Sequence, residues 1–143
     1  MSREYPARPI VGIGVVVLRP GGVLLAQRGK PPRVGSWTLP GGAQHIGETA
    51  EDAARRELRE ETGLGVGSLH FAAHVDAITH DAVGRVQYHY TILDFAALWT
   101  GGEARAGDDV SEVVWAEFDA LQPYGLWSEA HRVIGIARRL LGV

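Results

Sequence analysis

Hydrophobic positions along the chain form short apolar runs typical of strands, together with two stretches that have the spacing of amphipathic helices. Residues 10–18 are almost wholly apolar and rich in β-branched side chains, which predicts a buried strand. A Pro-Gly-Gly turn follows, and residues 23–26 predict the returning strand. A short segment, residues 37–39, follows a loop rich in proline and glycine. Three further stretches predict strands, at residues 69–79, 86–98 and 113–118.

The two helical stretches are residues 49–62 and 128–141. In the first, Thr49 and Asp52 have the spacing of a capping box, and Gly63 fits the left-handed residue that ends many helices. In the second, apolar residues recur at helical spacing opposite basic ones. The order strands, helix, strands, helix predicts an α/β fold, with a mixed β-sheet between helices.

The composition of the chain excludes several classes of function. A chain of 143 residues suits one domain, residues 1–143, with a substantial core. A formal charge of −3 lacks the basic footprint of a nucleic-acid binder, and the absence of cysteine excludes disulfide scaffolds and thiol chemistry. No apolar run has the length of a membrane span, and the N-terminus has no signal-peptide pattern. We expect a cytoplasmic protein whose partner is neither a membrane nor nucleic acid.

The acidic side chains of the first helix face an unusual direction. At about 100° per residue, Glu61 lies about 40° from Glu57, and Glu60 lies about 60° away on the other side. All three continue the stripe of alanines at 50, 53 and 54, which should face the sheet. Carboxylates gathered at a partly buried edge repel one another, and their pKa values rise. A hard cation such as Mg²⁺ relieves both penalties and prefers oxygen ligands.

A glycine pair precedes this helix. Gly41 and Gly42 let main-chain amides and carbonyls approach a ligand closely, so Gly42 is a candidate substrate-binding residue. A glycine turn alone is a weak signal. Followed by an acid cluster on the next helix, it predicts a site for a metal ion and a diphosphate.

Residues 42–64 resemble the signature of the Nudix hydrolases, G-x5-E-x7-R-E-U-x-E-E-x-G-U, where U is a bulky aliphatic residue. Every defining position is filled: Gly42, Glu48, Arg56-Glu57-Leu58, Glu60-Glu61 and Gly63-Leu64. The preceding segment, residues 37–42, is also similar to the family's entry to this box. The resemblance implies an α/β/α sandwich that hydrolyses a nucleoside diphosphate linked to another group.

The resemblance also implies roles for individual residues. Glu57 and Glu61 would be the principal ligands of Mg²⁺, with Mn²⁺ as a substitute. Glu60 and the main-chain carbonyl of Gly41 would complete the ligand set. Two further residues, Glu48 and Arg56, would orient these carboxylates; the alternative for this pair is an ion pair on the helix surface, which would add little stability.

Acids that precede a late tryptophan are candidates for a catalytic base. Asp109 stands where Nudix relatives commonly place a glutamate that acts as general base or as an extra metal ligand. Its shorter side chain has less reach, and Glu112 is the competing candidate. An ordinary solvated loop acid is the alternative for both.

Three segments outside the 42–64 signature, residues 25–29, 84–90 and 107–109, are most similar to the ADP-ribose pyrophosphatase group. This resemblance implies cleavage of ADP-ribose to AMP and ribose 5-phosphate. Arg28, at the end of a predicted strand, is a candidate phosphate clamp, with a surface arginine as the alternative. Two other functions stay open: a nucleoside triphosphate pyrophosphohydrolase and a non-catalytic nucleotide sensor. The family resemblance also raises the expectation of a homodimer.

Overall fold

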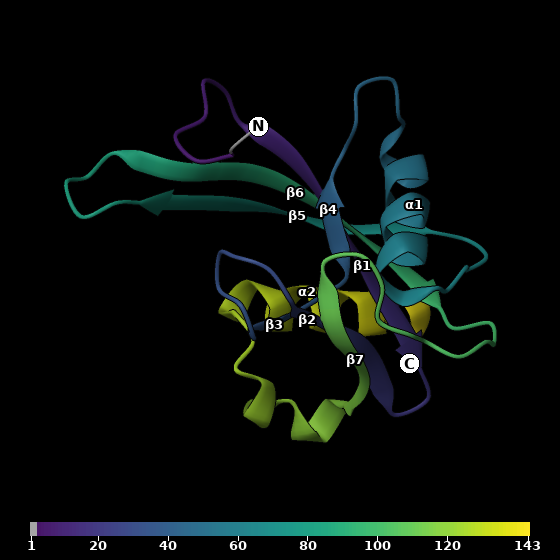
Figure 1. The fold of residues 1–143 in the computed structure, drawn as a ribbon. Helices are drawn as coiled ribbons and strands as arrows, with labels where there is room; N and C mark the ends of the chain where they lie inside the picture. The colour runs from purple at the N-terminus through teal and green to yellow at the C-terminus, as the bar shows by residue number, and fades with distance from the viewer. Residues whose placement is uncertain (1–2) are drawn as a thin grey trace.

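A mixed β-sheet with a helix on each face organises residues 3–143, the part of the chain that this computed structural model describes (Figure 1). The elements, in chain order, are β1 (Ile10–Arg19), β2 (Gly22–Arg28), β3 (Trp37–Thr38), β4 (Gly41–Ala43), α1 (Ala50–Thr62), β5 (His70–His80), β6 (Val86–Leu98), β7 (Val110–Glu117), the 3-10 turns Phe118–Ala120 and Gln122–Tyr124, and α2 (Ser128–Leu141). The predicted strands and both predicted helices are therefore confirmed, with small shifts at their ends.

The strand order places Gly42, the first residue of the 42–64 signature, at the middle of the sheet. The main path is β3-β2-β1-β6-β5, while β4 pairs with β1 and β7 pairs with β2. β1 and β6 run parallel, and the other strand pairs within residues 3–143 are antiparallel, which confirms the mixed sheet. One edge of β1 is taken by β6. Its other edge is shared between β4 and β2, so Gly41 and Gly42 lie directly beside the central strand.

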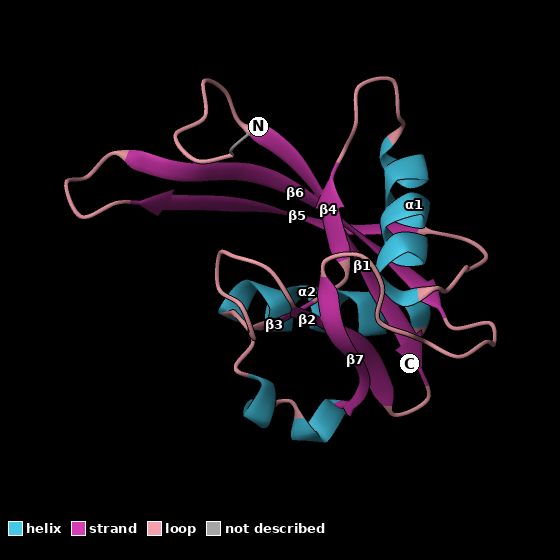
Figure 2. Ribbon diagram, viewed as in Figure 1, coloured by secondary structure: helices cyan, strands magenta, loops and turns pink. Residues whose placement is uncertain are grey.

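Alternation along β1 divides the core into two clusters. Val16 and Leu18 pack with the buried face of α2, whereas Val15 and Val17 pack with α1 on the other side of the sheet. Figure 2 shows the two helices separated by the strands. This arrangement confirms the expected α/β/α sandwich. Neither helix within residues 3–143 has the length and apolar character that a membrane crossing requires.

The ends of α1 follow the predicted capping chemistry. The Thr49 hydroxyl accepts a hydrogen bond from the Asp52 amide at 3.1 Å. Gly63 has a φ of 74° and donates its amide to the Arg59 carbonyl. The sequence did not predict β3, β4 or the two 3-10 turns, because segments of two or three residues are too short to show a periodicity.

Candidate active site

Strand β4 passes directly beneath α1, and the contact between them requires glycine. A Cβ atom at Gly42 would overlap the carboxylate of Glu57, which occupies the space beside the glycine main chain. Glu57 is only 8% exposed. The sheet therefore holds one acid of the helix against main-chain atoms of the glycine pair.

Glu61, one turn further along α1, contacts the same strand. The amide of Gly41 donates a hydrogen bond of 2.8 Å to Glu61 Oε1. Burial, reinforced by the negative charges of Glu57 and Asp108, raises the pKa of Glu61 to about 7. Burial also raises the pKa of Glu57, although the Arg56 guanidinium opposes the shift. Two carboxylates thus lie close together in a setting that disfavours their charge.

Arg56 connects the acids around this site. Its Nε and Nη2 atoms bond both oxygens of Glu48 at 2.6 and 3.0 Å, and its Nη1 atom lies 2.9 Å from Glu57 Oε1. Its Nη2 atom also donates to the Ala43 carbonyl at 3.0 Å. The bond to Arg56 lowers the pKa of Glu48 to about 2. One guanidinium therefore fixes β4, the loop before α1 and a carboxylate of α1 in one arrangement.

The alternative of an ion pair on the helix surface is wrong for Glu48 and Arg56. Glu48 precedes α1, and its side chain is 14% exposed against 18% for Arg56. The expectation that Glu60 continues the inward stripe is also wrong. Its side chain is 43% exposed and lies 3.1 Å from Arg56 Nη1, because residue 60 falls at the edge of the inward face. The role of Glu60 as a metal ligand stays a prediction.

The loop before β7 brings a different acid toward α1 than the one expected. Asp109 forms an exposed ion pair with Lys30 at 2.7 Å, and Glu112 is exposed within β7 opposite Gln27. Asp108 is the loop acid whose charge raises the pKa of both Glu57 and Glu61. It has a left-handed backbone with φ of 51°, a conformation that aspartate adopts more readily than most residues.

The sequence reasoning missed Asp108 because two adjacent aspartates cannot be told apart without the backbone conformation. Gly107, which precedes the two aspartates, is the feature of the sequence that could have indicated the role of Asp108. A Cβ atom there would collide with the Glu60 carbonyl, and the Gly107 amide donates to the Glu61 carbonyl at 3.1 Å. The glycine lets the loop approach the end of α1, and this approach carries Asp108 toward the carboxylates.

Arg28 is the last residue of β2 and pairs with Val110, next to the loop that carries Asp108. Its Nε atom donates a hydrogen bond of 2.7 Å to the Pro32 carbonyl, which holds the side chain against the loop after β2. Its positive charge lowers the pKa of Glu61, opposing the effect of the acids. The structure thus brings Arg28 into electrostatic range of the carboxylates, while its phosphate-binding role stays a prediction.

The donor set fits a divalent cation that is shared with a substrate. Within residues 3–143, no three histidine or acidic side chains converge closely enough to enclose a metal ion by themselves. Mg²⁺ usually needs only one or two carboxylates, and substrate phosphates and water supply its other ligands. Glu57 and Glu61 provide two hard carboxylates beside Gly41 and Gly42. The raised pKa values show that positive charge at this place would be stabilising.

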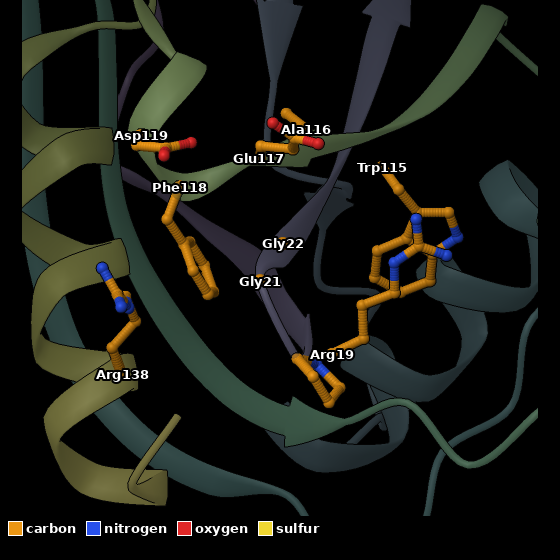
Figure 3. Close-up of a pocket in the computed structure, with 10 residues that line it drawn as sticks. Arg19, Gly21, Gly22, Trp115, Ala116, Glu117, Phe118, Asp119 and Arg138 are labelled. Atoms are coloured by element: carbon orange, nitrogen blue, oxygen red, sulfur yellow. The ribbon is translucent and has the colours of Figure 1, made fainter.

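A separate pocket of about 520 Å³ lies beside the turn between β1 and β2 (Figure 3). Its two arginines are engaged by aromatic rings: Arg138 lies 3.9 Å from the ring centre of Phe118, and Arg19 lies 4.5 Å from that of Trp115. No residue of the 42–64 signature lines this pocket. The chemistry predicted from the sequence therefore lies elsewhere, along β4 and α1.

Comparisons with known proteins agree with the fold and with the acid cluster. Residues 8–134 match the family model described as the NUDIX domain. A solved MutT Nudix hydrolase from Burkholderia pseudomallei superposes with a TM-score of 0.78 and 30% identity, covering 90% of this chain and 97% of that one. The Nudix domain of Shewanella oneidensis NrtR, solved with ADP ribose, has a TM-score of 0.78 at 24% identity and covers 95% and 90%, which is a likeness of fold. The chain belongs to the Nudix hydrolase family.

Curated relatives differ in the substrate that their names give. The ADP-ribose pyrophosphatase of Methanocaldococcus jannaschii is 34% identical over 113 residues, 79% of this chain and 64% of that protein. The oxidized purine nucleoside triphosphate hydrolase of Danio rerio is 32% identical over 115 residues, 80% of this chain and 70% of that protein. This chain therefore matches about two thirds of the length of each relative.

Proposed function

We propose that this protein is a Mg²⁺-dependent pyrophosphohydrolase that cleaves the diphosphate of a nucleoside diphosphate derivative. The observation that supports this function best is the pair of carboxylates, Glu57 and Glu61, held against the main chain of Gly41 and Gly42. Their raised pKa values indicate that the site is built for positive charge. A diphosphate bound with a divalent cation has the complementary chemistry.

Different residues of the chain have different roles in the proposed reaction. A divalent cation would neutralise the diphosphate oxygens and make the attacking water more acidic. Glu57 and Glu61 would hold that cation, and Arg56 would keep the Glu57 carboxylate in place. The water oxygen bonds to phosphorus, the bond from phosphorus to the bridging oxygen breaks, and the leaving phosphate takes the electron pair.

An acid must also accept a proton from the water. Asp108 is the first candidate, because its charge acts on both helix carboxylates. Asp109 and Glu112 remain the alternatives that the sequence indicates. Arg28 would bind a phosphate oxygen from the end of β2.

ADP-ribose, giving AMP and ribose 5-phosphate, is the first substrate that we propose, and the Methanocaldococcus jannaschii relative supports it. A nucleoside triphosphate, giving the monophosphate and pyrophosphate, is the second candidate, which the Danio rerio relative supports. A non-catalytic nucleotide sensor is the third. The complete acid set argues against it, because binding a nucleotide does not require all of these carboxylates.

The test is a substrate panel of ADP-ribose, dGTP and 8-oxo-dGTP, each incubated with Mg²⁺, Mn²⁺ or EDTA and separated by anion-exchange chromatography. AMP with ribose 5-phosphate identifies the first candidate, and a nucleoside monophosphate with pyrophosphate identifies the second. Glu57→Gln is the matched control, since it keeps the shape of the side chain and removes its charge. Nucleotide binding without any product in either metal would refute the hydrolase and support the sensor.

A further inference from the structure

Strand β6 carries a buried acid that the proposed hydrolysis does not use. Asp94 is 4% exposed and lies in the interior of the sheet, paired in register with Gly14 on β1 and with Ala73 on β5. A Cβ atom at Gly14 would overlap Asp94 Oδ1, so the carboxylate lies directly against the main chain of β1. Glycine at position 14 is what leaves room for this side chain.

No other group in the described structure neutralises Asp94. Within residues 3–143, its carboxylate has no hydrogen bond and no ion pair. The charge of Arg132 acts on it through space, but that guanidinium bonds Glu129 and the His74 carbonyl instead. Burial therefore raises the pKa of Asp94 to about 6. Buried polar groups nearly always have a partner, so an unpaired carboxylate in the middle of a sheet requires an explanation.

The Asp94 side chain is mostly buried, but its carboxylate oxygens are not closed off from solvent. Among residues 3–143, no side-chain oxygen or nitrogen is both closed off from solvent and without a hydrogen-bond partner. Because Asp94 has no such partner, its oxygens must remain accessible to solvent. On the sheet face that Asp94 shares, β1 has glycine at 12 and at 14; the Ile92 side chain lies over Gly12 and the Asp94 carboxylate lies over Gly14.

The position of Asp94 relative to the acid cluster fits one extended ligand. Gly14 is the register partner of Asp94 on one side and of Gly41 on the other. With strands about 4.8 Å apart, the main chain of Asp94 lies about 10 Å from that of Gly41. Gly41 in turn bonds Glu61. The Asp94 side chain lies on the face of the sheet that α2 covers, whereas the acids of α1 lie on the other face. Because β4 pairs only with β1 within residues 3–143, a nucleotide whose diphosphate lies at Gly41 and Glu61 would reach Asp94 by passing the free edge of β4.

We propose that Asp94 binds the nucleoside half of the substrate by accepting hydrogen bonds from two adjacent donors on it. This inference rests on the proposed nucleotide pyrophosphohydrolase function and adds a specificity-determining residue to it. The ligand chemistry is a pair of neighbouring N–H or O–H groups. The ring N–H and 2-amino groups of a guanine-type base supply such a pair, and so do the 2′- and 3′-hydroxyls of a ribose.

An ionised carboxylate can only accept hydrogen bonds, and this determines which groups of a nucleoside Asp94 can bind. Its two oxygens accept hydrogen bonds and donate none, so they suit two parallel donors. The adenine edge offers one amino group beside a ring nitrogen that is itself an acceptor. One oxygen of Asp94 would then face a lone pair and stay unsatisfied, which is costly in a buried site. The carboxylate thus favours the guanine-type base over adenine, unless the ribose is what it binds.

The experiment measures binding of product nucleotides by calorimetry, at pH 8 in Mg²⁺, to the full chain. GMP, IMP and 2′-deoxy-GMP separate the two sources of donors, because IMP lacks the 2-amino group and 2′-deoxy-GMP lacks one hydroxyl. We expect wild-type protein to prefer GMP over one of these analogues by about 5- to 150-fold, the range for one good bidentate contact. Weaker binding of IMP than of GMP identifies the base as the group that Asp94 binds. Weaker binding of 2′-deoxy-GMP than of GMP identifies the ribose.

Asp94→Asn should reduce GMP affinity by a similar factor and remove the preference between GMP and the affected analogue. Asp76→Asn is the matched control, because Asp76 is an exposed aspartate on β5 and should leave affinity and preference unchanged. Gly14→Ala is a second variant, since its added Cβ displaces the Asp94 carboxylate without changing its chemistry, and it should also weaken the preference.

A merely structural role for Asp94 would change unfolding and leave the preference intact. Retention of both affinity and preference in Asp94→Asn overturns the inference, and so does wild-type protein that binds none of the three nucleotides. Hydrolysis is scored separately on the substrate panel. Turnover with an unaltered preference in Asp94→Asn therefore refutes only the role of Asp94, whereas binding without turnover refutes only the hydrolase.

Discussion

Replacing Glu61 with glutamine should stabilise the metal-free protein while abolishing its activity. The structure gives the magnitude. Burial and two neighbouring negative charges raise the pKa of Glu61 from an ordinary 4.5 to about 7. A difference of one pKa unit corresponds to about 1.4 kcal/mol, so ionising this side chain in the folded protein costs about 3 kcal/mol. Glutamine keeps the oxygen that accepts the Gly41 amide and removes the charge.

The sign of the effect depends on pH. Because the folded protein holds the Glu61 proton more tightly than the unfolded chain does, folding is penalised as pH rises from about 4.5 to about 7. Below this window, wild-type protein and Glu61→Gln should have nearly equal stability. Above it, the variant should be more stable by about 3 kcal/mol, an increase in Tm on the order of 10 °C for a chain of this size.

The assay is urea denaturation in EDTA at pH 5, 7 and 9, followed by far-ultraviolet circular dichroism. Glu51→Gln, an exposed acid in the first turn of the same helix, is the control and should show no comparable dependence. Adding Mg²⁺ should stabilise wild-type protein more than Glu61→Gln. The reasoning is refuted if the stability difference between wild-type protein and Glu61→Gln is the same at pH 5 and pH 9.

Three further substitutions test the geometry around this acid. Gly42→Ala should displace the Glu57 carboxylate and lower kcat on the order of 100-fold with an unchanged circular dichroism spectrum, since its Cβ overlaps that carboxylate. Normal turnover would show that β4 does not position Glu57. Arg56→Lys should destabilise the protein by about 3 kcal/mol and weaken Mg²⁺ binding, because lysine lacks the planar fork; denaturation and Mg²⁺ titration measure both. Asp108→Asn should lower kcat, because it removes the first candidate for the proton acceptor. It should also move the acid limb of the pH–rate profile to lower pH, because the charge that it removes raises the pKa of Glu61. Asp109→Asn, which only breaks the pair with Lys30, should do neither. An unchanged profile in both variants would direct attention to Glu112.

The sequence predicts most of the fold and the centre of the candidate site. The capping residues of α1 and the positions of Glu57 and Glu61 follow from local rules, because helix geometry and glycine spacing act over a few residues. The contact of Gly42 with Glu57, in contrast, is a tertiary contact between β4 and α1 that only the structure shows. Family resemblance adds the chemistry, since the signature also names the supporting pair Glu48 and Arg56.

Other features depend on contacts that local patterns do not encode. Asp108 differs from Asp109 only through a left-handed backbone that the packing of Gly107 imposes. Glu60 lies at the edge of its helix face, where a small rotation decides between burial and solvent. Asp94 is one of several polar residues of β6, and the sequence does not show that it alone among them is buried, beside Gly14.

The end of α1 has a consequence for how the loop after β6 can vary. The last carbonyls of a helix lack partners within it, and here the amides of Arg105 and Gly107 supply two, at Thr62 and Glu61. These bonds involve only main-chain atoms, so side chains of this loop other than at Gly107 can change without losing them. The helix that carries the acids thus also anchors the segment bearing Asp108, and an insertion between Gly107 and Asp108 would alter the chemistry while leaving the scaffold intact.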